Sequence, residues 1–285
     1  MAGQTLLRVV AVAGSGVRPA RVIVLAMLAA LALGGCAVGH DGVRQLAAEH
    51  GLEAVWLPGA GFRLLGLYRP RPDPAAALHV YIEGDGRPWA TRTRVSPDPS
   101  PHNPLTLRLM LLDPAPSLYL GRPCYHGTAR EPPCTPWHWT HGRYSETVVE
   151  AMAAALEEFQ RRHGERRVTL IGYSGGGALA MLLAARLPRV EAVVTIAADL
   201  DTDAWTGLHG YSALAGSLNP ARLGALPASL RQVHFAGARD VNVPAWLVRR
   251  GLRAQPGASI EEIAGADHRC CWEARWPDML GRIGD

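Results

Sequence analysis

The sequence contains no lysine, only 3 phenylalanines, and no apolar run long enough to cross a membrane as a helix. Its 29 basic residues are therefore all arginine, which by itself indicates no function. Collagen-like repeats are absent, and a charged fraction of 19% is too low for a disordered chain. With 285 residues, of which 48% are hydrophobic, we expect one globular domain with a packed core.

The sequence also lacks a strong excess of either charge once its first 36 residues are set aside. The formal net charge is +4, but residues 1–36 hold Arg8, Arg18 and Arg21 and no acidic residue. The remainder has 26 of the 29 basic residues against 25 acidic ones. Because this surplus is only +1, no nucleic-acid partner is expected.

Residues 22–35 form an uncharged stretch that follows the three arginines and fits the apolar core of a secretory signal. The stretch ends in Leu33-Gly34-Gly35-Cys36, which resembles a bacterial lipobox, where a cysteine after small residues receives lipid. We expect residues 1–35 to be a lipoprotein signal peptide, Cys36 to be the lipid attachment site, and residues 36–285 to be a single domain. The alternative is an ordinary signal peptide with an incidental thiol. Since Ala37 rather than Asp follows the cysteine, we expect an anchor in the outer membrane of a bacterial envelope, facing the periplasm.

Four cysteines remain after the leader: Cys124, Cys134, Cys270 and Cys271. An exported protein meets an oxidising compartment, so disulfides are expected, and four cysteines allow three pairings. The local pairing joins Cys124 to Cys134 across a proline-rich loop, while Cys270 and Cys271 either pair in a strained ring or stay reduced. No CxxC spacing is present, which argues against a metal site or a thioredoxin-like redox motif.

Predicted strands alternate with predicted helices along the chain. Strands are expected at 54–57, 62–69, 78–82, 117–120, 167–171, 190–197, 232–236 and 259–263. Helices are expected at 41–53, 104–112, 146–163, 178–187 and 272–283. This order predicts an α/β fold with a mostly parallel central sheet and helices on both faces. The irregular segments 87–140 and 201–230 should lie beyond the strand ends, with 201–230 forming a small lid.

The peptide Gly172-Tyr173-Ser174-Gly175-Gly176 follows a buried strand directly and opens a helix. A G-x-S-x-G peptide alone is a weak signal, because a phosphate-binding or purely structural turn has the same composition. At a strand-to-helix turn, however, the strained backbone pushes the serine hydroxyl out of the sheet. The unpaired N–H groups at the start of the helix then favour a developing oxyanion.

A serine nucleophile needs a base and an acid that orients the base. Asp240 follows the strand at 232–236, and His268 follows the strand at 259–263. Rival acids are the cluster Asp199, Asp201 and Asp203, which follows the preceding strand, and Asp267, which adjoins the histidine. The aspartate cluster does not make a calcium loop, because Ala204 stands where an EF-hand needs glycine.

The chain order Ser, Asp, His at strand ends resembles the α/β-hydrolase superfamily over most of residues 54–285. The resemblance implies that Ser174 is the nucleophile, His268 the general base and then acid, and Asp240 the orienting carboxylate, with no metal or organic cofactor. Many members have a His-Gly pair after the strand at 78–82, whereas this chain has Glu83-Gly84-Asp85-Gly86. The oxyanion donors are then expected to be the backbone N–H groups of Asp85 and Gly175, and Glu83 is expected to hold the loop through hydrogen bonds.

The expected function is cleavage of a carboxylic ester, either a small molecule or a lipid, by a serine hydrolase anchored to the membrane. A thioesterase, an acyltransferase or a peptidase would use the same triad, and a non-catalytic envelope lipoprotein that kept the fold is a further alternative. Four residues are candidates for lining a substrate cleft or, equally, for packing in the core: Trp137, His138, Trp139 and His141. The sequence leaves the substrate and the oligomeric state open.

Overall fold

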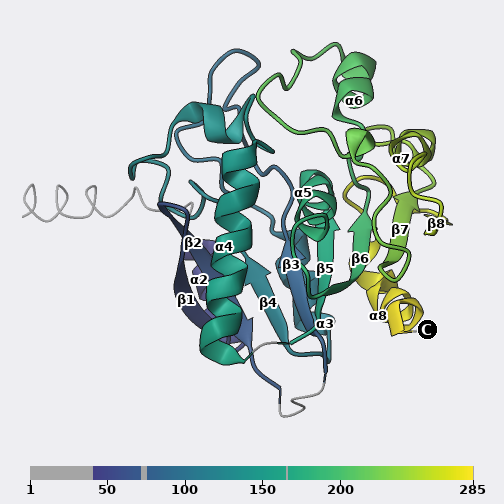
Figure 1. Cartoon of the computed structure of the whole chain (residues 1–285). Helices are drawn as coiled ribbons and strands as arrows, with labels where there is room; N and C mark the ends of the chain where they lie inside the picture. Colours follow the sequence, from purple (N-terminus) through teal and green to yellow (C-terminus); the bar gives the residue numbers. More distant parts are fainter. Residues whose placement is uncertain (1–40, 72–75, 165, 285) are drawn as a thin grey trace, which may run out of the picture. The chain divides into compact units, whose positions relative to one another are not determined.

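The computed structural model describes residues 41–71, 76–164 and 166–284 (Figure 1). The predicted signal peptide, residues 1–35, and the predicted lipid attachment site Cys36 lie outside the described residues. Within the described residues, no helix has the length and apolar character that a membrane crossing needs.

An eight-stranded sheet runs through the middle of the fold in the order β1-β2-β4-β3-β5-β6-β7-β8 (Figure 1). Only β2 runs antiparallel to its neighbours, so the sheet is mostly parallel, as the sequence predicts. The strands are β1 (Glu53–Gly59), β2 (Phe62–Arg69), β3 (Leu78–Ile82), β4 (Ser117–Leu120), β5 (Val168–Tyr173), β6 (Val190–Ile196), β7 (Arg231–Gly237) and β8 (Ala258–Ile263).

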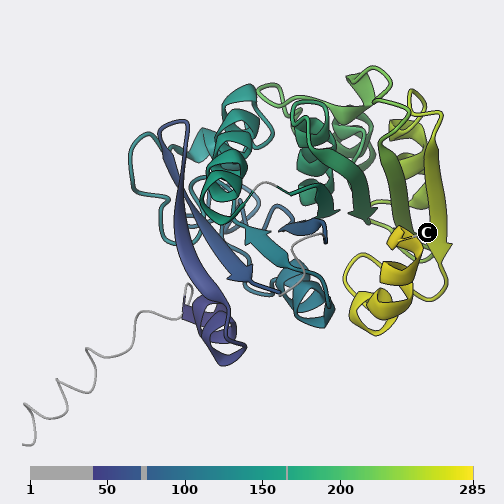
Figure 2. The same ribbon diagram turned by 60° about the horizontal axis from the view of Figure 1, so that its bottom comes forward.

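Helices cover both faces of the sheet, and each face has its own apolar cluster (Figures 1 and 2). One face is covered by α4 (Glu146–His163), α5 (Gly175–Ala184) and α7 (Ala245–Gly251). The other is covered by α2 (Asp41–Glu49), α3 (Leu105–Leu112) and α8 (Trp272–Gly284). The connections contain α6 (Thr202–His209) and two short 3-10 turns, η1 (Pro136–Trp139) and η2 (Pro220–Arg222).

The central strands are apolar on both sides because both of their faces are buried. In β3, Val80 and Ile82 pack into the cluster under α4 and α5, while Tyr81 packs into the cluster under α3 and α8. This two-sided burial fixes the register of the strands and holds their carboxyl ends together at one edge of the sheet.

The differences from the predicted elements have local physical reasons. The predicted turn at 58–61 is shorter, because β1 continues through Pro58 to Gly59. Proline is tolerated there since β1 is an edge strand that pairs only with β2. Helices α6 and α7 were not predicted, and both are too short, at 8 and 7 residues, to show a clear helical period.

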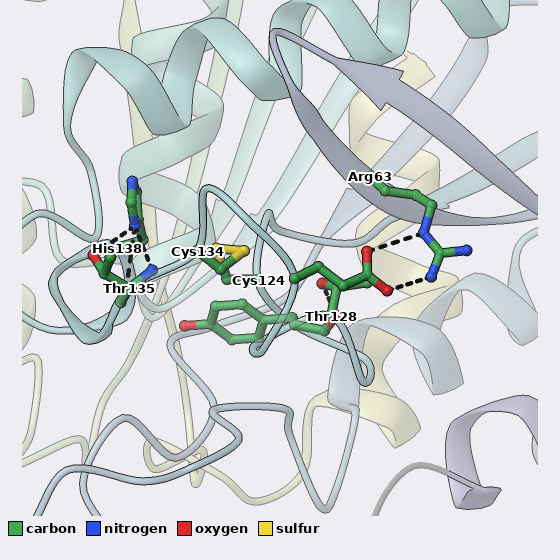
Figure 3. The surroundings of a disulfide bond; sticks show 8 residues. Arg63, Cys124, Thr128, Cys134, Thr135 and His138 are labelled. Atoms are coloured by element: carbon green, nitrogen blue, oxygen red, sulfur yellow. Dashed lines mark hydrogen bonds and ion pairs between the residues drawn. A yellow bond between two sulfur atoms is a disulfide. The ribbon is translucent and has the colours of Figure 1, made fainter.

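Two disulfides join the four described cysteines. The bond between Cys124 and Cys134 closes the loop that follows β4 (Figure 3). An ion pair between Arg63 of β2 and Glu131 ties the same loop to the sheet, and Thr135 and His138 hydrogen-bond where the loop enters η1. Of the two states left open for Cys270 and Cys271, the structure has the bonded one.

Candidate active site

Ser174 lies in the tight turn between β5 and α5, with the positive φ of 51° that such a turn requires. The glycines beside it are required by close approach of the backbone. A Cβ at Gly172 would lie 2.3 Å from the carbonyl oxygen of Gly176, and a Cβ at Gly176 would lie 2.2 Å from that of Ile82. The sequence pattern is therefore what allows the strand to turn sharply and place Ser174 at the wall of a cavity.

The structure brings Ser174, His268 and Asp240 together from the carboxyl ends of three strands. Ser174 Oγ lies 3.2 Å from His268 Nε2, and His268 Nδ1 lies 2.8 Å from Asp240 Oδ2. The other carboxylate oxygen of Asp240 accepts from the backbone N–H groups of Asn242 and Val243, each at 2.8 Å. This arrangement suits an imidazole that donates from Nδ1 and can accept the serine proton at Nε2.

Three of the four rival acids are engaged elsewhere, and none of the four hydrogen-bonds to His268 in the described structure. Asp201 caps α6 and pairs with Arg250 at 2.7 Å. Asp267 accepts from the backbone N–H groups of the two residues after His268. Asp203 is paired with an exposed arginine, Arg222. None of these three carboxylates is therefore placed to orient the imidazole of His268.

Asp199, the remaining rival, is buried away from solvent. Burial, together with the nearby charge of Asp85, raises the pKa of the Asp199 carboxyl well above its usual range. Asp199 forms no hydrogen bond to His268, so Asp240 is the candidate acid that contacts the imidazole.

The carboxylate of Asp85 forms a cluster that the sequence did not predict. It accepts hydrogen bonds from Arg122 at 2.7 Å, Arg143 at 2.6 Å and the Tyr144 hydroxyl at 2.8 Å. Burial alone would raise the pKa of this carboxyl, but the charges of Arg143 and Arg122 outweigh it and lower the pKa to about 2. The Tyr125 hydroxyl donates to the carbonyl oxygen of Asp85 at 3.0 Å, so the loop is held from both sides.

The two residues predicted to supply the oxyanion donors, Asp85 and Gly175, lie next to each other. A Cβ at Gly175 would lie 2.1 Å from Asp85 Oδ1, and both Asp85 and Ser174 line the same cavity. Among the described residues, no acceptor takes the backbone N–H of Asp85 or of Gly175. These two groups are therefore free for an oxyanion, a role that stays a prediction.

Glu83 holds the loop after β3, as the sequence led us to expect. Its carboxylate accepts from the backbone N–H of Gly84 and from the N–H and hydroxyl of Thr106, all between 3.0 and 3.1 Å. Burial raises the pKa of the Glu83 carboxyl, and these hydrogen bonds work against that rise. The glutamate thus joins the candidate oxyanion loop to the start of α3.

A cavity opens beside Ser174, and a second cavity shares one lining residue with it. The first, of about 650 Å³, contains Ser174 and His268 in its wall, and the second, of about 480 Å³, is lined by Trp89, His141 and Tyr211. Trp205 of α6 lines both, so the predicted lid segment contributes a wall of the site. Within the described residues, no group of His, Cys, Asp or Glu side chains is placed to hold a metal ion.

The predicted cleft residues separate into two groups. His141 lines the second cavity, whereas Trp139 is buried and donates from Nε1 to the carbonyl oxygen of Ser96. Trp137 and His138 line neither cavity. Trp89 and Trp205, which do line them, were not predicted because no local pattern distinguishes them from the other tryptophans.

Comparison with known proteins agrees with this architecture. A family model described as alpha/beta hydrolase fold matches residues 123–246. Among solved structures, an esterase from Pyrococcus furiosus has a TM-score of 0.57 at 16% identity, over 83% of this chain and 92% of that one. A serine hydrolase without a lid from Xanthomonas campestris has a TM-score of 0.51 at 16% identity, over 81% and 91%.

A bacterial membrane phospholipase A, described as a virulence factor, has a TM-score of 0.55 at 15% identity, over 93% of this chain and 99% of that one. No curated protein sequence matches the chain. The fold is an α/β-hydrolase fold, and the resemblance of the sequence motifs to the α/β-hydrolase superfamily is confirmed.

Proposed function

We propose that the protein is a serine hydrolase that cleaves a carboxylic ester through an acyl-enzyme intermediate. The observation that carries the proposal is the chain of hydrogen bonds from Ser174 Oγ through His268 to the buried carboxylate of Asp240, at the wall of a cavity. Two of the structural neighbours have the names of ester-cleaving enzymes, an esterase and a phospholipase A, which supports the reaction class.

Acylation starts when Ser174 Oγ attacks the ester carbonyl while His268 Nε2 takes the hydroxyl proton. The carboxylate of Asp240 stabilises the imidazolium that forms, and the N–H groups of Gly175 and Asp85 donate to the oxyanion. His268 then returns the proton to the leaving alkoxide, the C–O bond breaks, and the alcohol departs.

Deacylation repeats these steps with water. His268 takes a proton from the water, the hydroxide attacks the acyl-serine carbonyl, and the same two N–H groups hold the second oxyanion. The bond to Ser174 Oγ breaks, and His268 returns the proton to that oxygen. The carboxylic acid leaves and the enzyme is restored.

Steady-state hydrolysis of 4-nitrophenyl butyrate tests the reaction class. We expect wild-type protein to release 4-nitrophenolate and Ser174→Ala to lose about 10⁴-fold or more in kcat. Ser229→Ala, which changes an exposed serine that does not line the cavity beside Ser174, is the matched control and should retain full activity. Equal activity in Ser174→Ala and wild type would refute the proposed nucleophile, and matched thioester and amide substrates would establish the preferred acyl bond.

We further propose that the enzyme acts at the surface of a bacterial outer membrane, anchored by lipid on Cys36. The support is the leader sequence alone: three arginines, an apolar stretch and small residues before the cysteine. Incorporation of labelled palmitate into the expressed full chain tests this, with Cys36→Ala as the comparison. Labelling of the parent alone supports the anchor, and equal labelling of both proteins contradicts it.

A further inference from the structure

The wall of the 650 Å³ cavity carries more positive than negative side chains. Four arginines from four segments of the chain line it: Arg87, Arg108, Arg143 and Arg269. Two carboxylates line it as well, those of Glu83 and Asp85. The net charge of the cavity wall depends on which of the four arginines are paired with carboxylates.

Neither lining carboxylate is available to Arg87 or Arg269. Asp85 is already paired with Arg122 and Arg143, two cations to one anion, so this cluster keeps a surplus positive charge. Glu83 Oε1 accepts from the backbone N–H of Gly84, and Glu83 Oε2 accepts from the N–H and hydroxyl of Thr106. Both carboxylate oxygens therefore already have donors.

Arg108 is neutralised and held in place. Its Nε donates to Glu273 Oε1 at 2.7 Å, and a terminal nitrogen donates to the carbonyl oxygen of Pro104 at 3.2 Å. This arginine therefore shapes the cavity wall without adding a free charge.

Arg87 and Arg269 form no ion pair with a carboxylate anywhere in the described part of the chain. Arg87 donates one side-chain hydrogen bond, to the carbonyl oxygen of Ala90 at 3.3 Å, and the guanidinium of Arg269 donates none that the described residues accept. Both side chains are exposed. Arg269 directly follows His268, and Arg87 lies two residues after Asp85, so these two cations flank the groups of the proposed reaction.

We infer that the substrate is an ester with an anionic group, a carboxylate or a phosphate, near the scissile bond, and that Arg87 and Arg269 bind that group. The inference rests on the proposed function and adds the substrate class. A guanidinium matches the two oxygens of a carboxylate or phosphate with a fork of N–H donors. A cleft with an excess of one sign of charge also raises the local concentration of the opposite ion.

Matched esters of 4-nitrophenol test the inference on the acyl side. The anionic ester is 4-nitrophenyl hydrogen glutarate, the neutral one is the valerate, and the cationic one is the 4-(trimethylammonio)butyrate. We expect kcat/KM to fall in that order in wild-type protein. Each of Arg87→Gln and Arg269→Gln should lower the value for the anionic ester about tenfold, the effect of one charge-assisted hydrogen bond, and leave the neutral ester nearly unchanged.

Further pairs of substrates distinguish where the anionic group lies in the ester and whether it belongs to a lipid headgroup. On the alcohol side, 4-acetoxyphenyl phosphate and 4-acetoxybenzoate are compared with phenyl acetate. For a lipid headgroup, monomeric dihexanoylphosphatidylglycerol is compared with the zwitterionic phosphatidylcholine. Because both arginines are exposed, the preference should shrink as salt is raised, which a purely structural role would not produce. Arg167→Gln removes one exposed charge at the opposite ends of the strands and should leave the preference intact.

The inference is supported if wild-type protein has a higher kcat/KM for the anionic ester in any of these comparisons and the double variant Arg87→Gln/Arg269→Gln loses that preference. No preference in any comparison, or a preference that survives in the double variant, overturns it. If wild-type protein hydrolyses no ester, the proposed function fails separately. Calorimetric titration of Ser174→Ala with glycerol 3-phosphate then decides the inference: binding that the two arginine substitutions abolish supports it, and absence of binding refutes it.

Discussion

At the residue scale, the proposed chemistry depends on how firmly each side chain is held. Asp240 is fixed by two backbone N–H groups on one oxygen and by His268 on the other, so it has no freedom to turn away from the imidazole. His268 is held in turn through its carbonyl oxygen, which accepts from the Tyr173 hydroxyl at 2.8 Å. Preorganisation of this kind lets the groups stabilise charge without rearranging.

Asp240→Asn tests the orienting carboxylate. The amide fills the same volume but carries no charge to stabilise the imidazolium and favours the wrong tautomer of His268. We expect kcat for 4-nitrophenyl butyrate to fall by about 10³–10⁴-fold, with little change in the melting temperature. Asp201→Asn, at the rival acid, is the matched comparison: retention of activity in Asp240→Asn together with its loss in Asp201→Asn would reassign the acid.

Asp85→Asn tests the buried ion cluster through its pH dependence. Because folding lowers the pKa of Asp85 from 3.8 to about 2, the ionised carboxylate stabilises the folded state above pH 4, and that contribution is lost as the pH falls through about 2. At pH 7 we expect Asp85→Asn to lower the free energy of unfolding by about 3 kcal/mol, since two buried arginines lose their partner. Denaturant titrations at a series of pH values should show this difference shrinking between pH 4 and pH 2. A difference that is independent of pH would contradict the assigned role.

The sequence allowed prediction of the site residues that lie next to a strand end. It did not allow prediction of those that tertiary packing brings together from distant segments of the chain. Ser174, Asp240 and His268 each follow a predicted strand with a turn signal, so their placement could be predicted. Arg122 lies two residues after the end of β4, so its place near a strand end was a signal that could have pointed to it. Arg143 and Tyr144 precede a helix with no motif of their own, and only tertiary packing brings them to Asp85.

At the element scale, the turn from β5 into α5 is a tightly packed junction of the site. α5 is buried along its whole length, and its first turn lies against the carboxyl end of β3. The long apolar segments of the sheet and α4 could be predicted because their periodicity spans many residues. The short α6 and α7 could not, since their positions depend on contacts with the sheet rather than on a pattern of their own.

Gly176→Ala tests that junction. The new Cβ would lie 2.2 Å from the carbonyl oxygen of Ile82, so α5 must move away from β3. We expect a loss of about 1–3 kcal/mol in the free energy of unfolding and a reduced kcat. Gly207→Ala on α6 is the matched control, because no atom lies within 4 Å of its added Cβ, and it should stabilise the fold slightly. Equal effects of the two substitutions would show that close packing at the turn is unimportant.

The disulfide Cys124–Cys134 is linked to the candidate active site through the neighbouring Tyr125, whose hydroxyl donates to the carbonyl oxygen of Asp85. Replacing both cysteines by serine should lower the free energy of unfolding by about 2–3 kcal/mol, because the short loop is no longer closed in the unfolded chain. Thermal and chemical unfolding under oxidising conditions measure the difference. No destabilisation, with the bond verified in the parent by mass spectrometry, would show that the loop is held without it.

At the scale of the whole molecule, the parallel strands collect the reacting groups at one edge of the sheet, and the connections close a cavity around them. The order of strands and helices was enough to predict this architecture, because apolar runs alternating with helical patterns admit few topologies. Most of the cavity wall could not be predicted. Its arginines and tryptophans come from loops and from the helices α3 and α6, whose positions depend on packing throughout the molecule.

The central claim is that Ser174 is an activated nucleophile, and a fluorophosphonate probe tests it most directly. The purified protein is treated with the probe, and the adduct is located by mass spectrometry of the peptides. The account predicts one probe molecule per chain, attached at Ser174, with labelling absent in Ser174→Ala and strongly slowed in Asp240→Asn. An adduct on another residue, or equal labelling of Ser174→Ala and the parent, would contradict the account.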